Sequence, residues 1–498
     1  MSVTEEQLRR PPFAFAKRHG LLVGDDDGEQ VELLCRPGIS LDTLTEARRF
    51  LHRPVRVKTV TLEEFDAQLQ RAYEGNSGAA AGLVDGLSEE TGDLDSLASA
   101  LADAQDLLET DDDAPIIRFI NGLLVEAIKE NASDIHIETF EKRVTVRFRI
   151  DGVLREMLNP PRALAAKIVS RVKIMAKLDI AEKRLPQDGR ISRAFGGRKV
   201  DVRVSTIPTG SGNERVVMRI LDKQSEKLDL EQLGLDEQQI EVLKRTIHRP
   251  YGIMLVTGPT GSGKSTTLYS ALSMLNDRSR NILTVEDPIE YYIDGVGQTQ
   301  VNIKVEMTFA RGLRAILRQD PDVVMVGEIR DLETAQVSVQ ASQTGHMVFS
   351  TLHTNTAVGA ISRLRDMGLE GYQIASSLVG LMAQRLVRTL CPDCKTTCTA
   401  GPLERAQLGL PRDGEPVALY KPVGCPRCRH IGYSGRSGIY ELIEVDKKLE
   451  AMIHDGASDQ QLEDYARSKS AGILQSGRDK VLAGQTTLGE VLRVTIEE

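Results

Sequence analysis

The chain has 498 residues, several times the length that a single hydrophobic core needs, so about two to four domains are expected. Hydrophobic residues make up 41% and charged residues 27%, and no apolar run reaches the roughly 18 residues that could span a bilayer, so any membrane contact is expected to be peripheral. Without the acidic segment between Gly75 and Asp113, the net charge of −9 becomes +2, which leaves no basic stripe for a nucleic acid, and the 4% aromatic content offers few stacking platforms. Both features argue against a nucleic-acid partner. The N-terminus lacks the apolar core of a secretory signal, which favours a cytoplasmic protein.

The first module, residues 1–73, carries two short helical patterns, Leu41 to Leu51 and Leu62 to Tyr73. It shows no recognisable chemistry, so we interpret it as a docking module. Residues 74–113 are interpreted as an acidic flexible linker, because between Gly75 and Asp113 there are 11 Asp or Glu and no Lys or Arg.

Residues 114–223 have the pattern of an α+β domain. Apolar residues from Ile116 to Ile128 recur at three- and four-residue intervals, which predicts an amphipathic helix. Alternating residues from Val144 to Leu158, with a turn in the middle, predict a hairpin. A second hairpin is expected to turn at Gly196-Gly197, with a basic helix from Leu164 to Leu178 between the two hairpins.

After an interdomain linker at 224–234, residues 235–390 alternate between short apolar runs and helical stretches. This pattern predicts an α/β domain around a largely parallel sheet. Residues 431–498 are expected to form a C-terminal subdomain of short helices. The apolar runs are Ile253 to Thr257, Ile282 to Val285, Val323 to Val326 and Met347 to Ser350.

A glycine-rich loop follows the first of these runs and precedes a helical stretch. Gly258, Gly263, Lys264 and Ser265 satisfy the pattern G-x-x-x-x-G-K-[ST], in which backbone N–H groups surround phosphates, the lysine binds β and γ oxygens, and the hydroxyl serves magnesium. The alternative, a glycine-rich turn with a chance Lys-Ser, is disfavoured by the flanking strand and helix. The loop comprises Gly258, Pro259, Thr260, Gly261, Ser262, Gly263, Lys264, Ser265 and Thr266.

Carboxylates follow two other apolar runs. Glu286, Asp287 and Glu290 end the second run, and Glu328 ends the third. Hydrolysis of a phosphoanhydride needs one carboxylate for magnesium and another to orient or deprotonate water. Because acids at strand ends are common, only their place beside the phosphate loop makes them candidates.

Four of the six cysteines form two C-P-x-C pairs in a lobe at 391–430. Cys391 with Cys394, and Cys425 with Cys428, are corners that a tetrahedral zinc ion can join. A closed four-thiolate shell predicts a structural metal; redox dithiols, unrelated surface thiols and a nucleic-acid zinc ribbon are the alternatives. Cys35 and Cys398 are interpreted as ordinary thiols.

In combination, the segments GPTGSGKST, LTVEDPIE, VGEIRD and TGHMVFSTLHTN, in this order, resemble the secretion ATPase superfamily and specifically its type II secretion ATPases (the general secretory pathway protein E family). The resemblance covers nearly the whole chain after the linker. It implies a RecA-like P-loop domain preceded by a PAS-like α+β domain, and ATP and Mg²⁺ as ligands.

The resemblance also implies roles for single residues. Glu290 would activate water with Glu286 beside it, Glu328 would serve magnesium, and His353 would sense the γ-phosphate. The sequence alone does not rank Glu286 against Glu290.

Arginines beside the strands of the α+β domain are candidates for stabilising transition-state charge. They are Arg190, Arg203, Arg215 and Arg219. The resemblance assigns Arg203 and Arg219 to reaching the nucleotide. It places Arg314 and Arg318 at a subunit interface, although this spacing also suits a solvated helix face.

The implied function is an ATP-hydrolysing motor, peripheral on the cytoplasmic face of the inner membrane, that drives pseudopilus assembly and protein export. The implied partners are a bitopic membrane protein at the N-terminal module, the polytopic platform protein, and further copies in a homohexamer. The nearest alternative is a type IV pilus extension ATPase. A pilus retraction ATPase, which lacks the cysteine pairs, a nucleic-acid translocase and a non-hydrolysing nucleotide-binding scaffold are less favoured.

Overall fold

The computed structural model divides into two compact units, Met1–Gln224 and Ser225–Glu498, which we describe separately. It describes residues 20–26, 30–39, 44, 48–49, 54–61, 64–65, 68, 114–195, 198–210, 212–222, 229–411 and 414–495. Outside the described residues lie most of the two predicted N-terminal helices, the linker before residue 114, the turn at Gly196-Gly197 and residues 224–228 of the second linker.

The first unit begins with a three-stranded sheet that the helical patterns did not predict. Strands β1 (Leu21–Asp26) and β2 (Val31–Cys35) are antiparallel, and β2 pairs in parallel with β3 (Val55–Thr59). The Cys35 side chain is buried in this small core, and burial raises its pKa to about 11. A thiol with so high a pKa is unreactive, in agreement with its interpretation as an ordinary thiol.

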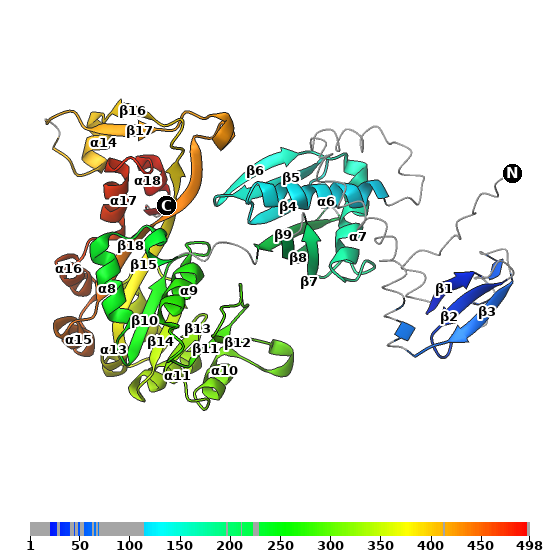
Figure 1. Cartoon of the computed structure of the whole chain (residues 1–498), viewed down its shortest axis with the longest axis horizontal. Coiled ribbons are helices and arrows are strands. Elements are labelled where there is room, and N and C mark those ends of the chain that lie inside the picture. Colours follow the sequence, from blue (N-terminus) through cyan, green and yellow to red (C-terminus); the bar gives the residue numbers. More distant parts are fainter. Residues whose placement is uncertain are drawn as a thin grey trace. The chain divides into compact units, whose positions relative to one another are not determined.

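The rest of the first unit is a six-stranded antiparallel sheet in the order β6-β5-β4-β9-β8-β7, with two helices on one face (Figure 1). Both predicted hairpins and both predicted helices are present. Phe119 and Leu123 of the first helix and Ile168 of the second are buried against strand residues. The elements are α6 (Ala114–Lys129), β4 (Asp134–Thr139), β5 (Val144–Ile150), β6 (Val153–Leu158), η3 (Arg162–Leu164), α7 (Ala165–Met175), β7 (Gln187–Phe195), β8 (Arg198–Pro208) and β9 (Glu214–Asp222).

The second unit is built on a seven-stranded sheet in the order β12-β11-β13-β14-β10-β15-β18, parallel except for the last pair. The strands are β10 (Gly252–Thr257), β11 (Ile282–Glu286), β12 (Gly297–Gln300), β13 (Val323–Val326), β14 (Met347–Leu352), β15 (Leu378–Leu390) and β18 (Tyr433–Glu444). The four predicted apolar runs are β10, β11, β13 and β14.

Helices cover both faces of this sheet. In β10, Ile253 and Leu255 face one core, while Met254 and Val256 face the other. Burial on both faces explains why the strands appear in the sequence as continuous apolar runs. The helices are η4 (Leu230–Leu233), α8 (Glu237–Ile247), α9 (Lys264–Leu275), η5 (Ile303–Val305), α10 (Phe309–Ile316), α11 (Leu332–Gln343), α12 (Gly359–Asp366) and α13 (Gly371–Ser377).

The end of the chain differs in part from the prediction. Residues 433–444, expected in the helical C-terminal subdomain, form β18. Its second half, residues 438–443, is buried without a break, and such a segment carries no alternation that separates a strand from a buried helix. Helices α15 (Lys447–His454), α16 (Asp459–Arg467), α17 (Ile473–Leu482) and α18 (Leu488–Thr495) follow it. Between β15 and β18 the chain forms a lobe with β16 (Thr396–Thr399), α14 (Pro402–Gln407), β17 (Ala418–Lys421) and η6 (Pro426–Cys428).

Among the described residues, we find no helix that is both long and apolar enough to cross a membrane.

A buried ion pair in the first unit generates a stability prediction. The Lys173 and Glu214 side chains are 0% and 3% exposed and contact each other. Lys173→Met would leave the Glu214 charge buried without its partner, so we expect the free energy of unfolding to fall by about 3–5 kcal/mol. The double variant K173M/E214L removes both charges and should recover most of this loss. Urea denaturation measures all three proteins; equal losses in the single and double variants would contradict the argument.

Candidate functional site

The glycine-rich loop joins the end of β10 to the start of α9. Gly258 has φ +147°, and a Cβ atom there would lie 2.5 Å from the carbonyl oxygen of Gln384. Gly263, with φ +88°, precedes the first helical residue, Lys264. Only glycine adopts these backbone angles and this close approach without strain. The loop therefore turns sharply and delivers the N-terminus of α9, where backbone N–H groups attract anions.

The Lys264 ammonium lies inside the turn. It donates to the carbonyl oxygens of Gly258 (2.7 Å) and Pro259 (3.1 Å). Burial lowers the pKa of Lys264 to about 8, the Glu328 carboxylate opposes this shift, and Arg385 adds to it. Carbonyl oxygens of the loop thus position the Lys264 ammonium, and charged groups after β13 and on β15 shift its pKa.

Glu286 ends β11 as a buried carboxylate that accepts three hydrogen bonds. One oxygen accepts from the Tyr269 hydroxyl, and the other accepts from Thr284 and from the Gln298 amide (3.0 Å). Glu286 as a whole is only 3% exposed to solvent. A carboxylate saturated in this way is well suited to hold its neighbours, and poorly placed to take a proton from water.

Glu290, in contrast, is exposed, and its backbone is held indirectly by Glu286. The Tyr269 hydroxyl donates to Glu286 and accepts from the backbone N–H of Glu290 (3.2 Å). Burial, and then the neighbouring Glu286, raises the pKa of Tyr269 well above its ordinary value, so this hydroxyl stays protonated as the donor. Tyr269, which the sequence did not single out, connects the two candidate glutamates.

Glu328 follows β13, and its carboxylate lies between the side chains of Arg330 and His353. One of its oxygens pairs with Arg330, and the other lies 3.5 Å from Nε2 of His353. His353 follows β14 with its side chain 52% exposed. Partial burial and then the Lys264 charge lower the pKa of His353, although Glu328 opposes them. The lowered pKa favours the neutral form of the His353 imidazole.

Threonines hold the loop that carries His353 against the phosphate loop. Thr257, the last residue of β10, donates to the carbonyl oxygens of Leu352 and Thr354 and accepts from the Thr354 backbone N–H (2.8 Å). Since β10, β11, β13 and β14 are parallel, their carboxyl ends meet at one edge of the sheet. The structure brings the loop, Glu286, Glu328 and His353 together at this edge.

Two further side chains at this edge were missed by the sequence analysis. Gln384 and Arg385 lie on β15, and Gln384 is 1% exposed. The Arg385 guanidinium donates to the Asn355 carbonyl oxygen (3.0 Å), in the loop after His353. The sequence feature that could have identified these two residues is the Gln-Arg pair that interrupts the apolar segment LVGLMAQRLV.

The candidate arginines of the first unit lie on the sheet face opposite its two helices. Arg190, Arg203 and Arg219 are direct cross-strand neighbours on β7, β8 and β9. Buried Asp134 accepts from Arg219 (2.8 Å), and buried Asp201 accepts from Arg190 (2.6 Å). These acids offset the repulsion of a row of like charges.

Burial raises the pKa of Asp134, but the hydrogen bonds from Arg219 and Ser133 outweigh burial, so the pKa lies below its usual value. Arg215 pairs with Glu138 (2.6 Å) on the same face. Arg190, Arg215 and Arg219 are thus partly exposed guanidinium groups, each paired with a buried acid of the same face.

Arg314 and Arg318 lie in the second unit, on α10 and just after it. Arg314 pairs with Glu333 (2.5 Å), and Arg318 donates to the Arg314 carbonyl oxygen (2.8 Å). Both arginines are exposed. The exposed position suits either a solvated face or an interface.

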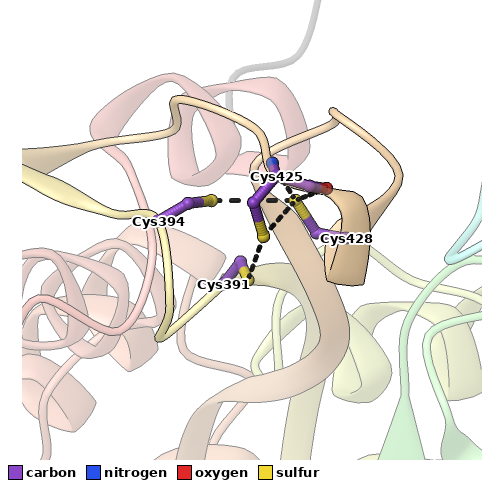
Figure 2. A group of neighbouring side chains, drawn as sticks. All are labelled: Cys391, Cys394, Cys425 and Cys428. Carbon is purple, nitrogen blue, oxygen red and sulfur yellow. Dashed lines mark hydrogen bonds between the residues drawn. The ribbon is translucent and has the colours of Figure 1, made fainter.

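The four predicted cysteine ligands converge at the base of the lobe (Figure 2). The Sγ atoms of Cys391 and Cys425 are 3.9 Å apart, those of Cys394 and Cys428 3.7 Å, and those of Cys425 and Cys428 3.7 Å. Thiolates about 2.3 Å from a tetrahedral zinc ion lie about 3.8 Å from one another, so the donor set and its spacing fit zinc.

Backbone N–H groups surround these sulfur atoms. Gly424 donates to Cys394, while Cys425 and Gly432 donate to Cys428 at 3.1 and 3.2 Å. Burial raises the pKa of Cys428, but hydrogen bonds with the backbone N–H groups of Cys425 and Gly432 and with the Cys394 and Cys425 side chains outweigh burial and bring the pKa to about 6. Thiolate is the form that binds a metal.

Comparisons with known proteins agree with this geometry. Residues 109–493 match the family described as "Type II/IV secretion system protein", and residues 10–73 match a domain family described under "GSPII protein E". "Type II secretion system protein E" of Pseudomonas aeruginosa is 57% identical over 490 residues, covering 98% of this chain and 97% of the relative. "Type II secretion system ATPase E" of Vibrio cholerae is 56% identical, covering 99% of this chain and 98% of the relative.

Solved structures share the fold. The pilus retraction motor PilT with bound ADP is 29% identical, with a TM-score of 0.52, and is matched over 76% of this chain and 97% of PilT. The ATPase DotB of Legionella pneumophila, 22% identical, has a TM-score of 0.56 over 76% of this chain and 95% of DotB. The two secretion proteins are 57% and 56% identical to this chain, whereas PilT is 29% identical. These comparisons therefore do not favour the pilus alternative. The chain therefore belongs to the type II/IV secretion system protein family, and within that family to the type II secretion ATPases.

Proposed function

We propose that this secretion ATPase hydrolyses ATP at residues 258–266 with Glu290 as the residue that activates water. The observation that carries the proposal is the contrast between the two glutamates after β11. Glu286 is buried with three donors, whereas Glu290 is exposed at the edge where the phosphate loop ends. Glu286 then acts through Tyr269, which fixes the backbone of Glu290.

Around the phosphates, each group has a distinct task. The backbone N–H groups of the loop and the Lys264 ammonium bind the β and γ oxygens. The Ser265 hydroxyl and the Glu328 carboxylate are hard oxygen donors that would hold Mg²⁺, which neutralises phosphate charge when bound. His353, neutral and partly exposed beside Glu328, is suited to hydrogen-bond the γ-phosphate.

Arg203 and Arg219 are proposed to supply positive charge to the transition state from the first unit. Support comes from their side-by-side position on β8 and β9 and from Asp134, which orients the Arg219 fork. Arg314 and Arg318 are proposed to line a contact between copies in a homohexamer, as expected from the family.

The four cysteines are proposed to hold a structural zinc ion, since all four positions of a tetrahedral site would be filled by protein. The N-terminal module would bind a bitopic inner-membrane protein, and the chain would act with the polytopic platform protein at the cytoplasmic face of the inner membrane, without a nucleic-acid partner. Through these contacts, hydrolysis would drive pseudopilus assembly and protein export.

The assignment of the glutamates is tested by two matched substitutions. E290Q should lower kcat about 100-fold or more, with little effect on nucleotide affinity or on the melting temperature. E286Q should lower the free energy of unfolding by about 1–3 kcal/mol, because an amide N–H₂ would face buried donors. ATP hydrolysis and thermal unfolding are measured on both variants, with E450Q, a surface change on α15, as control. Normal hydrolysis by E290Q would refute the assignment of Glu290.

The lowered pKa of Lys264 predicts a pH dependence. An ordinary lysine stays charged to about pH 10, but here the ammonium is lost as the pH rises through about 8. We expect kcat/KM for ATP, which reports the free enzyme, to fall by about tenfold per pH unit above pH 8. Bound phosphate favours the ammonium, so kcat should change much less over the same range. A flat kcat/KM up to about pH 9.5 would contradict this.

Metal analysis tests the cysteine site. The purified protein should contain one zinc ion per chain, and C391S/C394S should lose it together with stability of the lobe. Cys398→Ser changes a thiol of the same lobe outside the cluster and should keep the metal. Zinc content is measured by elemental analysis and stability by thermal unfolding. Loss of zinc without any fall in melting temperature would argue against a structural role.

A further inference from the structure

We propose that Gln384 is a positioning residue of the nucleotide site, whose side chain holds the phosphate loop and the first turn of α9 in their phosphate-binding arrangement. The inference rests on the proposed function, namely that residues 258–266 bind the phosphates of ATP. The inference adds to the nucleotide site a residue of β15, Gln384, which lies 122 positions after Ser262 of the loop.

The contacts of the Gln384 amide link two points of the site. Its Nε2 donates to the Ser262 carbonyl oxygen at 2.6 Å, and its Oε1 accepts from the Thr267 hydroxyl at 2.8 Å. A carbonyl oxygen only accepts, so the amide nitrogen must face Ser262, which fixes the orientation of the amide. All three residues are buried. One side chain therefore ties the middle of the loop to the helix that follows it.

The bond to Ser262 has a consequence for the next peptide group. The peptide bond is planar and trans, so its C=O and N–H point in opposite directions. Directing the Ser262 carbonyl oxygen at Gln384 turns the Gly263 N–H away from Gln384. Backbone N–H groups at this position of such loops are the ones that surround phosphates. Gln384 thus sets the direction of a donor without contacting the nucleotide.

The sheet explains why Gln384 is available for this task. The parallel pairing of β10 with β15 ends at Thr257 and Ala383. Beyond that pair, β10 leaves the sheet as the phosphate loop, while β15 continues with Gln384 and pairs only with β18. The Gln384 side chain thus bonds to the loop and to α9 just beyond the point where the backbone pairing of β10 with β15 has ended.

The test substitution is Gln384→Met in the full chain, which keeps the length of the side chain and removes both hydrogen bonds. Because the loop binds phosphates in the ground state and the transition state alike, we expect about tenfold weaker binding of ADP and about tenfold higher KM for ATP, with kcat changed less than about threefold. Fluorescent-ADP titration, ATPase kinetics and thermal unfolding without nucleotide are the measurements. Q343M removes a glutamine hydrogen bond from the surface of α11 and should match the wild type.

A second variant keeps the proposal testable if Q384M does not fold. T267V removes the partner of Oε1 and should weaken ADP binding by a smaller factor in the same direction. Where both variants fold, the double variant should bind ADP no more weakly than Q384M alone, because both changes break one bridge. Additive losses would overturn the proposal, as would unchanged ADP affinity in Q384M or a loss confined to kcat. Failure of the wild type to bind ADP would instead overturn the proposed function, and this inference with it.

Discussion

The pairing of β15 with two neighbours of opposite direction is the constraint on which the second unit depends. This strand of 13 residues runs parallel to β10 and antiparallel to β18. Its middle supports the phosphate loop through Gln384, and its end leads directly into Cys391. The roughly seven residues between these points span about 23 Å as a strand. The nucleotide loop and the cysteine cluster therefore share one continuous, hydrogen-bonded element, and neither can shift far without disturbing the ladder that carries the other.

In both units, buried carboxylates hold groups that lie closer to solvent. Glu286 in the second unit and Asp134 in the first are buried and saturated with donors, and each holds a group that lies closer to solvent: Tyr269 with the Glu290 backbone in one case, Arg219 in the other. Hydrogen bonds are stronger in such low-dielectric surroundings, and unpaired charges there are costly. The buried acids are thus suited to fix geometry, while the exposed groups that they hold remain able to meet a phosphate or a water molecule.

The sequence predicted features that are local in the chain. The phosphate loop, the four apolar strands around it and both hairpins of the first unit follow from short patterns whose physical causes lie within a few neighbouring residues. The contacts of Tyr269 and Gln384 could not be predicted in the same way, because their partners Glu286 and Ser262 lie 17 and 122 positions away in the sequence. The proposed ranking of Glu290 over Glu286 as the residue that activates water rests on the difference in their burial, which neither motif nor spacing contains. The N-terminal sheet was missed because two helical patterns were the only periodicity recognised there.

The long interval between the cysteine pairs also has an explanation in the sheet. Thirty residues separate Cys394 from Cys425, more than a zinc ribbon commonly has, and closing a longer loop costs more chain entropy. Here the loop is closed by β15 and β18, whose antiparallel register brings Leu390 opposite Tyr433. The cysteines stand just beyond this last pair, so strand pairing places the two corners near each other whatever the length of the lobe. A metal bound to the four thiolates would then act less to bring distant segments together than to fix the direction in which the lobe leaves the sheet.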